Sequence, residues 1–97
     1  MIALKEYGTD LSSRANGSRL RIRILQQLED SDPVTVDCVD VRTVSEGFAD
    51  EVFGILVQTF GREWFKEHIH FLNLTDSIRD AILRAIAARL NLESQSC

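Results

Sequence analysis

The sequence has little proline, little glycine and almost no cysteine. One proline and five glycines among 97 residues leave no segment with the composition of a flexible linker, so one domain spanning residues 1–97 is expected. The two cysteines are Cys38, inside an apolar run, and Cys97, the last residue. We do not expect them to pair, and their spacing matches no zinc motif.

The sequence also lacks a basic excess, a leader and a long apolar run. A net charge of −4 argues against nucleic acid as a partner. No apolar run is long enough to cross a membrane, and no signal peptide is recognisable. Together with the unpaired cysteines, these absences predict a cytoplasmic protein that has no membrane partner.

Motifs of catalysis are missing as well. There is no Gly-rich phosphate loop, no Gly-x-Ser-x-Gly sequence, and no Ser–His or Cys–His pair at a recognised spacing. We therefore expect neither an enzyme nor a cofactor.

The most informative stretch runs from residue 34 to residue 60. Residues 34–39 (VTVDCV) alternate and are rich in β-branched side chains, which predicts a strand. A loop over residues 40–47 follows, and Ser45 stands at the expected N-cap of a helix. The apolar stripe of this helix, at steps of four residues, consists of Phe48, Val52, Leu56 and Phe60. Gly61 is expected to end the helix.

The rest of the chain alternates between strand and helix patterns. The other expected elements, in chain order, are a strand over 1–7, a helix over 12–29, a helical turn over 62–67, a strand over 68–74 and a helix over 75–92. This β-α-β-α-β-α order predicts an α/β domain with a mostly parallel sheet of three or four strands and helices packed on it. In so small a sheet, a poorly covered face or an edge that meets another chain is expected.

The central stretch also carries a resemblance to a known family. An aspartate ends a strand, a loop with a valine follows, and a small polar residue precedes a helix that opens Phe-Ala-Asp-Glu. These residues are Asp37, Val41, Ser45 and residues 48–51, and a Leu-Ser-Ser-Arg sequence lies upstream at residues 11–14. The order resembles the STAS-like bacterial domain of unknown function, which is related to the STAS domains of anti-sigma-factor antagonists. The resemblance implies a bacterial signalling module whose partner is a histidine-kinase-like ATPase or an anti-sigma factor.

The resemblance makes Ser45 a candidate phosphorylation site. In anti-sigma-factor antagonists a serine at this loop-to-helix junction is phosphorylated, and the added charge of about −1.5 to −2 breaks the complex. Those antagonists usually present Asp-Ser-Ser-Gly or Asp-Ser-Thr-Gly, whereas residues 44–47 here are Val-Ser-Glu-Gly and the preceding loop is shorter. Either Ser45 or Glu46 therefore occupies the switch position. The alternative without a switch is that Ser45 only caps the helix.

Acidic side chains surround the same loop. They are Asp37, Asp40, Glu46, Asp50 and Glu51. Such carboxylates can hold Mg²⁺, but their spacing matches no loop motif, and we favour helix-dipole complementarity with a solvated rim. Asp37 interrupts a strand that should be buried, so we expect it to support the loop by accepting hydrogen bonds from backbone amides.

Two further groups have ordinary interpretations. His68 and His70 fall on one face of a predicted strand, but no third ligand lies nearby, so packing is favoured over a metal site. The clustered arginines are Arg14, Arg19, Arg21 and Arg23. They do not share one helical face, and a partly salt-bridged surface is favoured over phosphate binding.

The leading functional hypothesis is a non-enzymatic regulatory module that docks a protein partner through the loop and helix around residues 40–56. The predicted partner-binding residues are Asp40, Val44, Ser45, Glu46, Gly47 and Phe48. Two alternatives remain open. One is a STAS domain that senses a nucleotide or another small ligand at the carboxyl end of the sheet. The other is a self-associating subunit, such as a homodimer, that uses a sheet edge or the pair Trp64 and Phe65.

Overall fold

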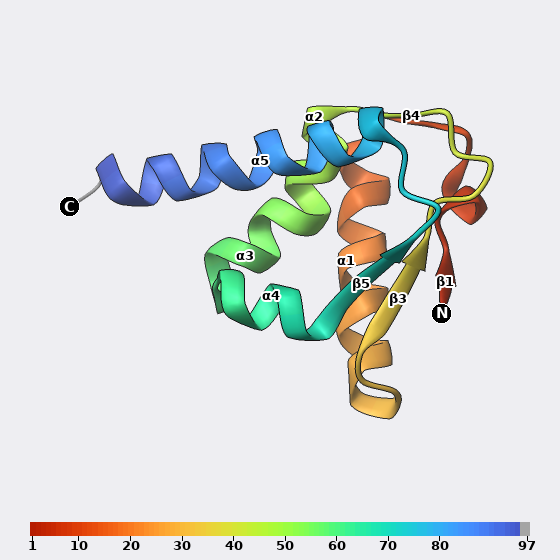
Figure 1. The fold of residues 1–97 in the computed structure, drawn as a ribbon, viewed down its shortest axis with the longest axis horizontal. Helices are drawn as coiled ribbons and strands as arrows, with labels where there is room; N and C mark the ends of the chain where they lie inside the picture. Colours follow the sequence, from red (N-terminus) through yellow and green to blue (C-terminus); the bar gives the residue numbers. More distant parts are fainter. Residues whose placement is uncertain (96–97) are drawn as a thin grey trace.

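A computed structural model describes residues 1–95 of the chain (Figure 1). The elements are β1 (Ile2–Ala3), η1 (Leu4–Tyr7), β2 (Asp10–Leu11), α1 (Arg14–Asp30), β3 (Val34–Asp37), β4 (Thr43–Val44), α2 (Glu46–Ala49), η2 (Asp50–Gly54), α3 (Ile55–Phe60), α4 (Arg62–His68), β5 (Ile69–Leu72) and α5 (Asp76–Gln95). The predicted α/β class and the alternation of strands and helices are confirmed.

The main sheet has three parallel strands in the order β1-β3-β5, so β3 lies at its centre. In the register, Val36 of β3 stands between Ile2 of β1 and Phe71 of β5. A second, two-stranded parallel ladder joins β2 to β4 and was not predicted. The strand expected over residues 1–7 was too long. After Ala3 the chain leaves the ladder and forms the 3-10 helix η1, in which Leu4 is buried in the core. This helix ends at Gly8, which has φ of 122°.

Helices cover one face of the main sheet. Figure 1 shows α1 running behind β3 and β5, and the helices α3 and α4 beside them. Val34, Val36 and Ile69 are buried on the covered side. The alternate positions, Thr35, Asp37, His70 and Leu72, are half-buried or exposed. Within residues 1–95 the second face of the sheet is therefore open to solvent.

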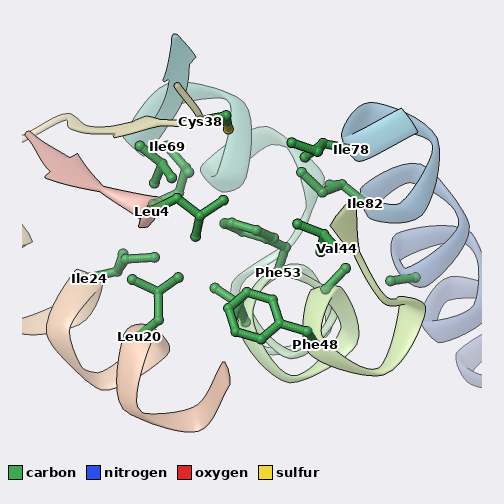
Figure 2. Close-up of a cluster of buried hydrophobic side chains, with 14 of the residues drawn as sticks. Leu4, Leu20, Ile24, Cys38, Val44, Phe48, Phe53, Ile69, Ile78 and Ile82 are labelled. Atoms are coloured by element: carbon green, nitrogen blue, oxygen red, sulfur yellow. The ribbon is translucent and has the colours of Figure 1, made fainter. Parts of the chain in front are cut away.

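The core is centred on Phe53. Figure 2 shows its ring with Leu4 and Ile24 on one side and Val44 and Ile82 on the other. The ring meets Phe65 and Phe71 edge-on, with centroids 6.0 Å and 5.2 Å away. These contacts join the central helix to α4 and β5. Cys38 also lies in the core as a free thiol, and burial raises its pKa to about 11. Cys97 lies outside the described residues.

The predicted central helix is present, but its middle turn is wider than expected. Residues 46–60 form one continuous helix in which η2 is a π-helical segment between α2 and α3. Gly61 ends it with φ of 99°. Phe48, Val52 and Leu56 are buried as predicted, whereas Phe60 is 46% exposed. Each i to i+4 step drifts by about 40° around an α-helix, so a long series leaves the core face.

Two glycines let helices approach closely. A Cβ on Gly17 of α1 would lie 2.9 Å from Glu51 Cβ and 3.1 Å from the Phe48 carbonyl oxygen. A Cβ on Gly54 would lie 3.2 Å from Arg89 Cγ and 3.4 Å from the Ala85 carbonyl oxygen, both on α5. The helix α1 continues through Gly17 without a break. Its N-cap is Ser13, whose side chain accepts a hydrogen bond from the backbone N–H of Asn16.

The expected later elements need small corrections. The strand predicted over residues 68–74 is limited to Ile69–Leu72, because His68 still belongs to α4. The last helix begins where the Thr75 hydroxyl accepts from the Ile78 N–H at 3.2 Å. None of the helices found over residues 1–95 is both long enough and apolar enough to cross a membrane.

Candidate functional site

The loop after β3 is tied down at its base by Asp37. The carboxylate accepts from the Val39 N–H at 3.0 Å and from the Asn73 side-chain amide at 2.9 Å. The hydrogen bond from Asn73, followed by the one from Val39, lowers the pKa of Asp37. The side chain is half-buried rather than buried, because it lies on the open face of the sheet. Further along, Asp40 is exposed and adopts φ of 64°, with Lys5 Nζ 3.5 Å from its carboxylate.

Ser45 is the N-cap of the central helix. Its hydroxyl oxygen accepts from the Phe48 N–H at 3.0 Å, and its own N–H donates to the Leu11 carbonyl at 2.8 Å. The residue is half-buried. These bonds fix the entry of the helix, because they anchor it both to its own first turn and to β2.

The predicted contact surface divides into an exposed part and a buried part. Val44 and Phe48 face the core, so neither side chain can touch a partner in this conformation. Val44 pairs with Leu11 in the β2–β4 ladder, and Phe48 packs in the core shown in Figure 2. The other four predicted residues, Asp40, Ser45, Glu46 and Gly47, are exposed or half-buried. We call these four residues the loop rim.

Asp50 joins three helices instead of only complementing a helix dipole. Its two oxygens accept from Arg89 Nε and Nη2 of α5, each at 2.7 Å, and one oxygen also accepts from Arg14 Nη1 of α1 at 3.0 Å. The carboxylate is only 15% exposed. The hydrogen bond from Arg89 is the main cause that lowers the pKa of Asp50; partial burial opposes it and Arg14 adds to it. Asp50 therefore acts as a charged tie between α1, η2 and α5.

Glu51 extends this tie along α1. It accepts from Arg14 Nη1 at 3.1 Å and from Arg21 Nη1 at 3.2 Å, and Arg21 also donates to its backbone carbonyl. The two remaining clustered arginines point elsewhere: Arg23 pairs with Glu6, and Arg19 donates to Asn16. The arginine group is thus a set of intramolecular contacts, and the favoured interpretation of a partly salt-bridged surface agrees with the structure.

A polar cleft of about 460 Å³ lies beside the loop rim. Its lining residues are Arg14, Glu46, Gly47, Asp50, Ala85, Ala88 and Arg89. The cleft joins the first turn of the central helix to α5. Sequence reasoning missed Arg89, because it lies 39 positions from Asp50 on another helix and no local pattern connects the two.

The histidines and the aromatic pair make contacts within the chain. His68 Nδ1 lies 2.8 Å from Asp32, and its ring packs on Trp64, while His70 is exposed on the open face of the sheet. Phe65 is buried, and Trp64 stacks on Phe60 with ring centroids 4.3 Å apart. In the part of the chain that the structure describes, no three His, Cys, Asp or Glu side chains gather as metal ligands.

The fold defines a class of small α/β domain in which a central parallel strand leads through a short loop into a capped helix. The model of a family described as a STAS-like domain of unknown function matches residues 16–79, and the chain belongs to this family. The matched range contains the loop rim, Asp50 and all of α1 except its first two residues, whereas Arg14 and Arg89, which bind Asp50, lie outside the range. No curated protein and no solved structure matches the chain.

Proposed function

We propose that the chain is a non-enzymatic, cytoplasmic regulatory module that docks a protein partner through the loop rim. The supporting observation is that the rim residues, which are exposed or half-buried, lie in the loop and first turn of a helix whose position is fixed by the Ser45 cap and the Asp50 tie. Rigid elements hold contact residues more accurately than free loops do. The relation to anti-sigma-factor antagonists makes a histidine-kinase-like ATPase or an anti-sigma factor the partner to test first.

Glu46→Arg is expected to abolish capture of this partner from the native host. Glu46 lies in the first turn of α2 and is exposed, so the substitution reverses a charge at the centre of the rim. Glu63→Arg is the matched control, because Glu63 is also exposed and in the first turn of a helix, α4, away from the rim. Affinity capture with the intact protein, read by mass spectrometry, gives the result. Equal recovery of the ATPase or anti-sigma factor with both variants would exclude docking through the rim.

Phosphorylation of Ser45 would regulate this docking. A phosphate there would stand at the positive end of the helix dipole, which tolerates negative charge, and would add that charge beside Glu46. The modification would therefore alter the contact surface without unfolding the helix. Phosphosite mapping on the captured protein tests whether the modification occurs.

Three substitutions distinguish the helix-capping role of Ser45 from its proposed role as a phosphorylation switch. Ser45→Ala is expected to lower the free energy of unfolding by about 1 kcal/mol, because the Phe48 N–H loses its acceptor. Ser45→Asn and Ser45→Asp both keep a capping oxygen, so each should be close to the wild type in chemical denaturation. Of these two variants, only Ser45→Asp should weaken the complex with the partner, because it alone adds a negative charge. If Ser45→Asn weakens it equally, the charge is not the switch.

A further inference from the structure

A separate apolar groove lies between α4, β5 and α5. Its volume is about 210 Å³, and Val57, Phe65, Phe71, Ile82 and Ile86 form its floor and walls. It is distinct from the polar cleft, since the two are lined by different residues of α5. Nothing in the docking proposed for the loop rim uses this surface.

The apolar surface of the groove extends to its exposed edge. Leu74 and Leu83 line its opening and are 37% and 55% exposed, respectively. A hollow that is bordered by exposed leucines exceeds what scattered surface residues provide and is typical of an interaction surface.

Every charged residue that lines this groove within the described chain is a cation. These residues are Arg62, Lys66 and Arg79. The groove is therefore positively charged, although the net charge of the chain is −4. Lys66 and Arg79 have acidic neighbours one helical turn away, Glu63 at 3.9 Å and Asp76 at 3.3 Å. Such exposed pairs are weak and readily exchanged for another anion.

We propose that this groove binds an acidic amphipathic helix of a partner protein. Apolar side chains at helical spacing would enter the groove and cover Leu74 and Leu83, while flanking Asp or Glu residues would meet Arg62, Lys66 and Arg79. The volume favours a peptide, because small-molecule sites usually have about 300–1,000 Å³. This groove is smaller, which suits a few anchor side chains. A second copy fits poorly, because a two-fold contact would bring the three cations near their own equivalents.

The test selects peptides without assuming a sequence. A phage-displayed library of random amphipathic peptides of about 16 residues, long enough to form a helix, is panned on the whole protein. Selected peptides should have Leu, Ile or Phe at i, i+3 or i+4, and i+7, and an excess of Asp and Glu. In fluorescence anisotropy they should bind Leu83→Asp roughly tenfold more weakly than the wild type.

Matched variants control for general effects. Ile22→Asp introduces the same charge at an equally exposed position of α1, outside the groove, and should bind like the wild type. Lys66→Glu should weaken binding, whereas Arg84→Glu, on an exposed position of α5 that does not line the groove, should not. Raising the ionic strength from about 0.1 M to 1 M should also weaken binding.

Several results would overturn the proposal. One is selection of peptides without acidic residues, and another is equal binding by Leu83→Asp. No peptide enrichment, together with a rise in melting temperature of the wild type but not of Leu83→Asp in decanoate, would assign the groove to a small amphiphile. A dimer in sedimentation that Leu83→Asp converts to a monomer would assign it to a second copy.

Discussion

Replacing Phe53 with alanine is expected to lower the free energy of unfolding by about 3–5 kcal/mol. The Phe53 side chain is 1% exposed at the centre of the core, and its ring meets Phe65 of α4 and Phe71 of β5. The substitution would open a cavity where three elements meet, and aromatic edge contacts would be lost as well. Urea denaturation followed by circular dichroism measures the change. A domain of this size is stable by only about 5–15 kcal/mol, so the variant should be marginal.

Phe60→Ala is the matched control. It makes the same chemical change on the same continuous helix, but the Phe60 side chain is 46% exposed and its ring stacks on Trp64. We expect a loss of about 1 kcal/mol, mostly from that stacking. If Phe60→Ala destabilises the protein as much as Phe53→Ala does, the helix face that meets the sheet has been misassigned.

The element order was predictable because its signals are local. The alternation of residues 34–39 depends on neighbouring residues and gave the central strand. Ser45 and Gly61 marked the two ends of the central helix, because a cap needs only the backbone groups of one turn. The family resemblance rested on this same stretch, and it is confirmed.

The features that were missed depend on contacts between distant segments. The β2–β4 ladder has two residues on each strand, too few for any periodicity. The π-helical turn at residues 50–54 leaves no mark in the apolar pattern, which suits an α-helix equally well. The bond between Asp50 and Arg89 joins positions 39 residues apart. Sequence reasoning favoured the helix dipole for Asp50 over Mg²⁺ binding, because the spacing of the acidic residues matches no metal-binding loop.

The candidate site was predicted in part, and Phe48 shows why. The apolar stripe placed Phe48 in the core, whereas the analogy with docking domains placed it on the contact surface. The structure supports the stripe, since Phe48 is fully buried. Periodicity reports which residues share a face, but it does not say how far the buried face extends toward the end of a helix. The exposed rim that remains carries the docking proposal.

Asp50→Asn is expected to lower the free energy of unfolding by about 2 kcal/mol at pH 7. The substitution keeps the shape of the side chain but leaves Arg89, which is only 25% exposed, without its anion. The loss should fall below that of a fully buried pair, because water still reaches and screens both groups. Asp80→Asn, the same change at an exposed position of α5, should have almost no effect. Chemical denaturation of the three proteins measures the difference.

The same comparison should depend on pH in one direction only. The hydrogen bond from Arg89 lowers the pKa of Asp50 in the folded state below its value of about 3.9 in an unfolded chain. The unfolded state therefore binds the proton first, and the stability that Asp50 contributes is fully present above roughly pH 5. It should be lost as the pH falls through the folded-state pKa. The gap between wild type and Asp50→Asn should accordingly be constant from pH 5 to 8 and shrink below pH 4. A gap that persists unchanged at pH 2 would mean that the difference between the two proteins does not come from the charge of the Asp50 carboxylate, and it would exclude Asp50 as a charged tie between α1, η2 and α5.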